Sequence, residues 1–432
     1  MPTIRFNTST GSDTNASGSN GSISVNGTSA SFSGSVVTLD GSPDLSGFDA
    51  DEDVLWLQTS TGRQFFDLSS VDDTAKTVTC VDAPAGTASG LTWGIGGKRA
   101  TLEDINSRLL FSDDAKAGWT AELEDDQTIN SAITIGVTGS ANNYITIRGN
   151  GTTRTITQTA DASIFEALIY HKTDWQFEHL KLQNSNASKT AARGFYLRGN
   201  VDWLIVDCII GDSVNQLFHG IQRLSASVDL RIIRTVIEEC TNDGVILGAG
   251  KTVFQDSVIR NNGVRGVEGN VSTLHFRNSQ VYGNTNEGVY ALNSTVYAKN
   301  SVFQGNGGSG IYYSGSSDDT IISDNIFSEN GDYGLDPGAI SQVDSVVRNA
   351  FYNNATADTS TTTTDEIILT ADPFTDAANG DFSLNETVGG GAVLRAETAT
   401  IGSTTLSPFL YFTTQSESSN EIIVLVDGGL VR

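Results

Sequence analysis

Five stretches decide the fold: RTVIEECTNDGV (234–245), QDSVIRNNGVRGV (255–267), RNSQVYGNTNEGV (277–289), KNSVFQGNGGSGI (299–311) and SDNIFSENGDYGL (323–335). Aligned on the glycine before their last residue, they share three columns with spacings of 22 to 24 residues. The columns are Gly244, Gly266, Gly288, Gly310 and Gly334; Asn262, Asn284, Asn306, Asn330 and Asn354; and Ile237, Ile259, Val281, Phe303, Phe327 and Phe351.

A repeat of this length without helical periodicity predicts stacked coils of short strands, because one coil cannot bury its own apolar face. Leu274 and Phe276 alternate with polar residues, as in a half-buried strand. A bend at residues 278–279, a strand from Val281, a turn at 283–284 and a third strand after Gly288 complete the coil. Three strands and three turns per coil predict a right-handed parallel β-helix.

The polar columns fit this interpretation. Asparagine tolerates a left-handed turn, and its amide can bond to the coils above and below, so we interpret the asparagine column as a structural ladder. Cys240 occupies the same column one coil earlier. We interpret the glycine column as a tight turn rather than a phosphate-binding loop.

These repeats resemble the right-handed parallel β-helix superfamily, which includes pectate-lyase-like enzymes and phage tailspike or appendage proteins. The segment DNIFSENGDYGL (324–335) is the most similar to the typical coil of that group. The resemblance covers residues 200–355, with weaker coils upstream, for example NNYITIRGNG (142–151). Downstream, ADPFTDAANGDFSLN (371–385) resembles the closing segment of such helices.

The rest of the chain predicts an all-β protein in four parts. Residues 1–100 are expected to form a small β-domain of attachment type with a flexible first 30 residues, and residues 101–117 a helix that caps the solenoid. Residues 118–385 are expected to form the β-helix, starting with a strand in 118–129. Residues 386–432, with strand candidates at 409–412 and 422–426, are expected to cap it or to pair between chains.

Composition excludes several classes of protein. The 432 residues carry 25 Lys and Arg against 51 Asp and Glu, a net charge of −26, which repels phosphate and predicts no nucleic-acid partner. The chain has no apolar stretch of membrane-spanning length, and MPTIRFNTSTGSDTNASG at its start lacks a signal-peptide core. We therefore expect no membrane insertion and synthesis in the cytoplasm. Cys80, Cys208 and Cys240 predict reduced, buried thiols.

No catalytic signature emerges, so the sequence leaves enzymatic activity undecided. A polygalacturonase-like hydrolase would show Gly-His-Gly, whereas this chain has Phe218-His219-Gly220, and His219 falls at an ordinary exposed coil position. Asp324 and Arg348, one coil apart, suggest a surface ion pair rather than a lyase site. The sequence predicts no cofactor and no metal site, although Asp318–Asp319 leave a structural calcium ion open.

Tyrosines suggest a binding surface instead. Two residues after the glycine, an outward column is predicted that contains Glu268, Tyr290, Tyr312 and Asp336, with Tyr313 beside it. Tyrosine presents a face suited to sugar rings and a hydroxyl suited to their edges, and carboxylates accept hydrogen bonds from sugar hydroxyls. The alternative is that tyrosines are simply good strand residues.

The resemblance and this column together predict a β-helix protein of a virion or extracellular surface, similar to a phage tailspike or appendage, that recognises a host surface polysaccharide. A homotrimer and contacts of the N-terminal domain with other virion proteins are expected. One alternative is a polysaccharide lyase or glycoside hydrolase. Another is a purely structural or adhesive surface protein.

Overall fold

The computed structural model describes residues 3–6, 25–46, 53–59, 62–81, 87–97, 120–135, 144–167, 174–198, 202–224, 229–314, 320–338, 345–361, 363–397, 399–401, 404–406, 409, 424–426 and 429–431. The chain divides into two compact units, Met1–Leu217 and Phe218–Arg432. We describe each unit by itself.

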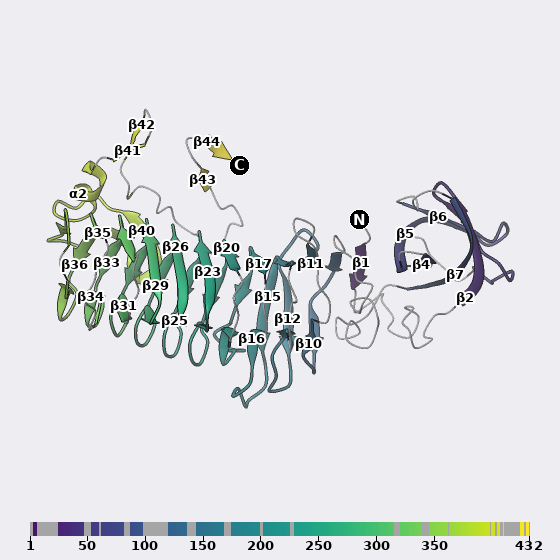
Figure 1. Ribbon diagram of the computed structural model, residues 1–432, viewed down its shortest axis with the longest axis horizontal. Coiled ribbons are helices and arrows are strands. Elements are labelled where there is room, and N and C mark those ends of the chain that lie inside the picture. Colours follow the sequence, from purple (N-terminus) through teal and green to yellow (C-terminus); the bar gives the residue numbers. More distant parts are fainter. Residues whose placement is uncertain are drawn as a thin grey trace. The chain divides into compact units, whose positions relative to one another are not determined.

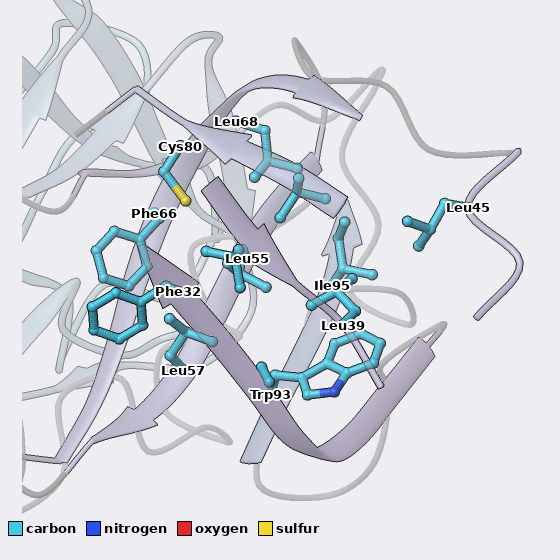
Figure 2. Close-up of a cluster of buried hydrophobic side chains, with 13 residues drawn as sticks. Phe32, Leu39, Leu45, Leu55, Leu57, Phe66, Leu68, Cys80, Trp93 and Ile95 are labelled. Carbon is cyan, nitrogen blue, oxygen red and sulfur yellow. The ribbon is translucent and has the colours of Figure 1, made fainter. Parts of the chain in front are cut away.

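The first unit contains a closed antiparallel barrel in the order β2-β3-β6-β5-β4-β7. Its strands are β2 (Val25–Ser33), β3 (Val36–Thr38), β4 (Asp53–Thr59), β5 (Gly62–Asp72), β6 (Thr77–Cys80) and β7 (Thr87–Gly97). Alternating strand residues such as Leu55, Leu57 and Trp93 are almost fully buried and form an apolar core (Figure 2). The Trp93 indole N–H donates to the Asp40 carboxylate, so this buried donor is satisfied. Alternation of apolar and polar residues therefore predicted this β-structure correctly.

The first unit also contains parallel strands in three sheets. Sheet 1 runs β1 (Thr3–Phe6), β8 (Thr120–Leu123), β11 (Ile145–Gly149), β14 (Trp175–Glu178) and β17 (Trp203–Val206). Sheet 2 contains β9 (Gln127–Ile129), β12 (Arg154–Gln158), β15 (Leu180–Asn184) and β18 (Ile209–Ile210). Sheet 3 contains β10 (Ile133–Thr134), β13 (Phe165–Ala167) and β16 (Arg193–Leu197).

The extreme N-terminus departs from the flexible arm that we expected. Thr3–Phe6 form strand β1, which pairs in parallel with β8 from Thr120 to Leu123. The edge of β8 is thereby covered, which removes a row of backbone groups that could pair with another chain. The predicted capping helix at 101–117 lies outside the described residues.

The second unit has the same three-sheet pattern, with parallel strands following one another along the chain (Figure 1). Sheet 1 here has β20 (Leu230–Ile233), β23 (Gly250–Gln255), β26 (Ser272–Arg277), β29 (Thr295–Lys299), β32 (Ile321–Ser323) and β35 (Ser345–Val347). Sheet 2 has β21 (Val236–Glu238), β24 (Val258–Arg260), β27 (Gln280–Tyr282), β30 (Val302–Gln304), β33 (Ile326–Ser328), β36 (Ala350–Tyr352) and β38 (Ile367–Ile368). Sheet 3 has β19 (His219–Arg223), β22 (Val245–Leu247), β25 (Val267–Asn270), β28 (Val289–Leu292), β31 (Ile311–Ser314), β34 (Tyr333–Asp336) and β37 (Ala357–Thr359).

The apolar column has the predicted register. Ile237 pairs with Ile259, which pairs with Val281, and the series continues through Phe303 to Phe351. Successive phenylalanine rings stack with centroids 5.1 and 5.3 Å apart. Three strands per coil and an interior of stacked side chains are therefore confirmed.

The asparagine column forms a buried ladder between sheets 2 and 3. The Asn262 side chain donates to Asn284 Oδ1 at 2.9 Å, and the pattern repeats from Asn284 to Asn306, Asn306 to Asn330 and Asn330 to Asn354. The left-handed turn that we had attributed to this column lies one residue earlier, for example at Asn261 (φ 54°) and Gly305 (φ 57°). The ladder asparagines thus supply hydrogen bonds, and their predecessors supply the turn. Cys240 belongs to this column, because its backbone N–H donates to Asn262 Oδ1 at 3.2 Å.

The glycine column also has a different cause from the tight turn that we expected. A Cβ on Gly288 would lie 2.6 Å from the Gly310 carbonyl oxygen and 2.8 Å from Asn306 Nδ2. Gly266 and Gly310 are equally confined by the next coil. Glycine is therefore required here for close approach of successive coils, and the backbone at these positions is not left-handed.

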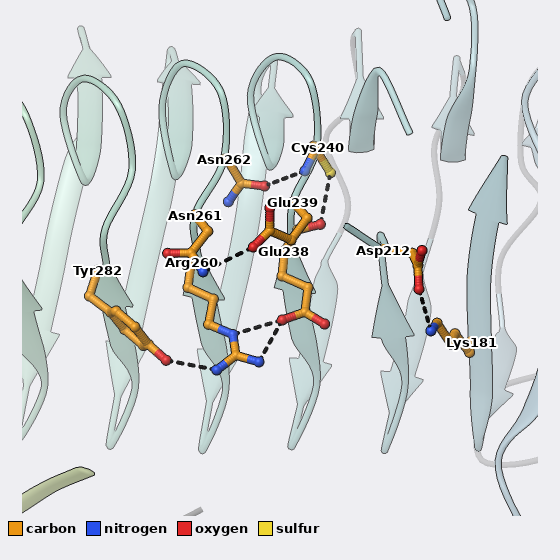
Figure 3. A network of polar contacts seen from close by, with 9 residues as sticks. All are labelled: Lys181, Asp212, Glu238, Glu239, Cys240, Arg260, Asn261, Asn262 and Tyr282. Atoms are coloured by element: carbon orange, nitrogen blue, oxygen red, sulfur yellow. Dashed lines mark hydrogen bonds and ion pairs between the residues drawn. The ribbon is translucent and has the colours of Figure 1, made fainter. Parts of the chain in front are cut away.

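A second ladder occupies the bend between sheets 1 and 2, where the sequence predicted only a change of direction. The Ser257 amide donates to the Ser279 hydroxyl, and the Asn325 amide donates to Asn349 Oδ1. In the same bend Arg348 Nε donates to Asp324 Oδ1 at 2.6 Å, which confirms the predicted ion pair. On the outer face of sheet 2, Arg260 joins Glu238 at 2.7 Å and the Tyr282 hydroxyl at 3.0 Å (Figure 3).

The C-terminal part covers apolar side chains on the outer face of sheet 2. Its elements are β39 (Phe374–Asp376), η1 (Ala377–Asn379), β40 (Asp381–Leu384) and α2 (Gly391–Ala396). Phe382 packs edge-on against Tyr282 and Phe374, and the same cluster includes Val302, Ile326 and Leu394. Two further hairpins follow, β41 (Ala399–Ile401) with β42 (Thr404–Leu406) and β43 (Val424–Val426) with β44 (Gly429–Val431).

The cysteines match their prediction, since Cys80, Cys208 and Cys240 are buried and free. Burial raises the pKa of the Cys208 thiol to about 12, which makes it unreactive at neutral pH. Among the described residues, no helix is long and apolar enough to span a membrane.

Candidate functional site

Glu268, Tyr290, Tyr312 and Asp336 lie in register on four neighbouring strands of sheet 3, and we call this set the tyrosine column. Glu268 pairs with Tyr290, Tyr290 with Tyr312, and Tyr312 with Asp336. All four side chains are partly exposed, so they form one outward row. At a strand spacing of about 4.8 Å, the two carboxylates are three strands and roughly 14 Å apart.

The two tyrosine rings stack on each other, with centroids 5.0 Å apart and planes 12° apart. The Arg265 guanidinium lies 4.2 Å from the centroid of the Tyr290 ring. The faces of Tyr290 are therefore in contact with Tyr312 and Arg265. These contacts occupy the Tyr290 ring, which differs from the face-on stacking on sugars that we expected from the sequence.

Tyr313 does not belong to this surface. It pairs with Ala291, its side chain is fully buried, and it points into the core. Consecutive strand residues face opposite sides of a sheet, so Tyr312 and Tyr313 cannot both be outward. The prediction of Tyr313 as a carbohydrate-binding residue is therefore wrong.

Arg265 connects the column to further carboxylates. Its Nη1 lies 2.6 Å from Glu268 Oε2 and its Nε lies 3.0 Å from Glu287 Oε2. These side chains are about one quarter exposed, so the network lies at the surface. At the other end of the column, Asp336 Oδ1 accepts from the Gly338 amide at 3.0 Å and the Ser360 hydroxyl at 2.8 Å. Both carboxylates are thereby held in place beside the tyrosines.

A buried acid–base pair lies in the same row as Arg265, with Asp243 one coil and His219 two coils before it. His219 and Asp243 are each 4% exposed, and His219 Nδ1 lies 3.3 Å from the Asp243 carbonyl oxygen and 3.8 Å from Asp243 Oδ2. His219 is thus buried, contrary to the exposed position that we expected. Burial raises the pKa of Asp243 to about 6, outweighing the hydrogen bond from the Arg265 amide.

From the sequence we assigned no functional role to the row that contains His219, Asp243, Arg265 and Glu287. The available signal was the position of these residues directly before the glycine column and adjacent to the tyrosine column. The sequence could not predict that Asp243 is buried, because its burial depends on how the coils pack around it. This burial is what raises the Asp243 pKa.

The described residues contain no cluster of three or more His, Cys, Asp or Glu side chains arranged to hold a metal ion. Asp318–Asp319, where the sequence left a calcium ion open, lie outside the described ranges.

Comparison with known proteins supports the fold. Residues 166–327 and 219–372 match the family model described as the right handed beta helix region. No curated protein matches the chain.

Several solved structures are similar at low identity. A pectate lyase, Pel9A, is 14% identical with a TM-score of 0.44, and the match covers 74% of this chain and 85% of that one. An alginate lyase from Paenibacillus sp. str. FPU-7 is 13% identical with a TM-score of 0.38, covering 62% and 96%. Tailspike protein 2 from Escherichia coli O157:H7 bacteriophage CAB120 is 13% identical with a TM-score of 0.38, covering 79% and 43%.

These similarities at low identity concern the fold alone. The activities named for these proteins are not carried over to this chain. The repeat columns, the three parallel sheets and the family match agree on one architecture. Residues 166–372 of this chain thus match the right handed beta helix region, and the strands there form the three parallel sheets of a β-helix.

Proposed function

We propose that the tyrosine column binds sugar units of a surface glycan, and that the protein is a virion- or cell-surface β-helix protein of tailspike or appendage type. The observation that carries the proposal is the row of two stacked tyrosines with a carboxylate on the strand at either end. Phenol hydroxyls donate and accept hydrogen bonds, and carboxylates accept strong ones, which suits a ligand rich in hydroxyl groups.

Rigidity supports the same proposal. The Tyr290 ring is held between Tyr312 and Arg265, and Arg265 is in turn held by Glu268 and Glu287. Polar groups that are already ordered lose little side-chain entropy when a ligand binds. The barrel has an apolar core of its own, which supports a separate attachment role for that part of the chain.

Removal of only the two hydroxyls tests the column. Tyr290→Phe with Tyr312→Phe keeps the ring stack, so we expect an unchanged circular dichroism spectrum and a glycan Kd at least about tenfold weaker. Tyr352→Phe on sheet 2 is the matched control and should bind as wild type. Equal binding by the double variant and the wild type across a panel of neutral and acidic bacterial polysaccharides would mean that the column is not the site.

A second candidate function, cleavage of the glycan, is supported by Asp243. A carboxyl with a pKa of about 6 can carry a proton under conditions where ordinary carboxyls are ionised, as a general acid requires. New reducing ends or unsaturated-uronate absorbance, lost in Asp243→Asn, would favour this candidate. Binding without either product would favour recognition alone.

A further inference from the structure

The two ends of the tyrosine column differ in the groups that lie beside the rings. The Tyr290 and Tyr312 rings stack with centroids 5.0 Å apart. This separation is close to the strand spacing of about 4.8 Å, so each ring turns its two faces toward the neighbouring strands of sheet 3. One face of each ring meets the other ring. The second face of Tyr290 therefore points toward the preceding coil, and the second face of Tyr312 points toward β34.

At the Tyr290 end, the chain itself supplies a cation. The Arg265 guanidinium lies 4.2 Å from the centroid of the Tyr290 ring, and its Nη1 lies 2.6 Å from Glu268 Oε2. This arrangement combines a cation–π contact with a charge-assisted hydrogen bond. A tyrosine face and a carboxylate of the tyrosine column thus hold a cation together within this molecule.

At the Tyr312 end, the same two kinds of group occur without a cation. Asp336 is the register partner of Tyr312, and its Oδ1 accepts two hydrogen bonds, at 3.0 and 2.8 Å. Within the described ranges, its second oxygen, Oδ2, has no hydrogen-bond donor. Residues 300–347, which include β31 and β34, contain no Lys, Arg or His. This segment therefore has no counterpart of Arg265.

A third tyrosine lies at this end of the column. Tyr333 precedes Asp336 by three residues, as Arg265 precedes Glu268 two strands earlier on the other side of the tyrosine pair. Tyr333 and Asp336 are both partly exposed on β34. Tyr312, Tyr333 and Asp336 thus place two aromatic side chains and a carboxylate on two adjacent strands, a combination that suits a cationic group.

The surrounding sequence adds a long-range attraction for cations. Residues 300–394 contain fourteen Asp and Glu side chains and a single basic one, Arg348. Arg348 is itself paired with Asp324. Half of the net charge of −26 thus belongs to this segment. Such an excess attracts cationic ligands and repels anionic ones.

We propose that Tyr312, Tyr333 and Asp336 form a subsite for a protonated amine, so that the tyrosine column selects glycans with amino sugars whose nitrogen is unsubstituted. The proposal rests on the proposed function for sugar binding and adds the charge of the preferred unit. The ammonium group donates to Asp336 Oδ2 and contacts the aromatic rings, as Arg265 does at the other end. An N-acetyl group removes this charge, and a carboxylate on the sugar reverses it.

The hydroxyl groups of the column favour a sugar amine over a lysine-rich peptide. An amino sugar carries hydroxyl groups next to its amine, and these can pair with the phenol hydroxyls of Tyr290 and Tyr312. A lysine side chain is apolar up to its ammonium group and leaves those phenol hydroxyls without a partner.

The fully deacetylated and the fully acetylated hexamers of glucosamine are matched probes that differ in charge. By calorimetric titration in mildly acidic buffer at physiological ionic strength, we expect the wild type to bind the deacetylated hexamer about tenfold or more tightly. Asp336→Asn keeps an oxygen for the partners of Oδ1 but removes the charge, so the affinity ratio should fall to about one. Glu386→Gln removes the same charge from a side chain that is 82% exposed in the segment over sheet 2, and should keep the full preference.

Tyr333 offers a second, independent pair of variants. Tyr333→Phe retains the aromatic ring and should keep the preference for the deacetylated hexamer. Tyr333→Leu removes the ring and should reduce that preference severalfold, because the cation–π contact is lost. Circular dichroism spectra that match the wild type show that both variants are folded.

The outcomes separate this proposal from the proposed function. Equal binding of the two hexamers by the wild type, or an undiminished preference in Asp336→Asn, overturns the amine subsite. If the acetylated hexamer then still binds, and is lost in Tyr290→Phe with Tyr312→Phe, the proposed function stands without the subsite. A preference that persists in that double variant but disappears in Asp336→Asn supports the subsite and contradicts the role of the tyrosine hydroxyls. Hexalysine that binds as tightly as the deacetylated hexamer, with the same sensitivity to Asp336→Asn, would show a general cation site and refute selection of amino sugars.

Discussion

At the scale of single residues, Gly288 shows how closely the coils approach. Its neighbours leave no room for a methyl group, because the Gly310 carbonyl and the Asn306 amide lie where a Cβ would stand. Gly305, by contrast, has a left-handed backbone (φ 57°), and apart from its own chain neighbours nothing lies within 4 Å of the position that a Cβ would take there. The two glycines, 17 positions apart along the chain, are therefore required for different physical reasons.

This difference predicts unequal effects of substitution on stability. Gly288→Ala should lower the free energy of unfolding by about 1–3 kcal/mol, because the coils must move apart. Gly305→Asn should be close to neutral, because asparagine tolerates the left-handed conformation and occupies the equivalent turn at Asn261. Urea unfolding of both variants checks this. Similar losses in both would contradict the assignment of close approach to one and turn geometry to the other.

Asp243 makes stability depend on pH. Its carboxyl ionises near pH 3.8 in the unfolded chain and near pH 6 in the folded protein. Its stabilising contribution is therefore complete below about pH 4 and is lost as the pH rises through 6. Asp243→Asn keeps an oxygen for the Arg265 amide but cannot ionise, so relative to wild type it should gain stability on the order of 2 kcal/mol between pH 4 and 7. Unfolding free energies measured across that range test this, and a constant difference would be evidence against it.

At the scale of elements, the hairpin β39–β40 acts as a cover for sheet 2. Outward apolar residues such as Val302 and Ile326 would be exposed without it, and Phe382 fills the space between Tyr282 and Phe374. The repeat predicted the strands of sheet 2 and their register. The repeat could not predict this cover, because the position of an outward valine in the repeat does not show whether a later segment of the chain packs against it.

Loss of the Phe382 ring should therefore loosen the hairpin from sheet 2. Phe382→Ala is expected to cost about 3–5 kcal/mol, the range for a buried aromatic residue. Limited proteolysis should cut residues 371–397 faster in the variant. Asn379→Ala, which removes only an exposed contact with Asp376, is the control. Unchanged cleavage in Phe382→Ala would mean that the hairpin is held by other contacts.

At the scale of the whole molecule, sequence reasoning succeeded where one physical requirement repeats in every coil. The columns through Phe303 and Asn306 were correct because each coil places the same residue type at the same bend or core position. It failed where a feature occurs once. Strand Thr3–Phe6 pairs with β8, and His219 is buried. Each of these features occurs once, so the repeat could not predict either of them.

The C-terminal hairpins bear on oligomeric state. β41–β42 and β43–β44 have strands of three residues, and among the described strands no third one pairs with either. Isolated two-stranded hairpins are marginally stable in water, so pairing with other copies of the chain would complete them. We therefore expect self-association and, for the homotrimer predicted from the sequence, a sedimentation-equilibrium mass of three times the 45.7 kDa chain mass. Truncation after Phe409, which removes β43–β44 but keeps β41–β42 and the buried cluster, should weaken self-association and lower the sedimented mass. A full-length protein that sediments as a single 45.7 kDa species would contradict the trimer, because the hairpins would then be stable without partners.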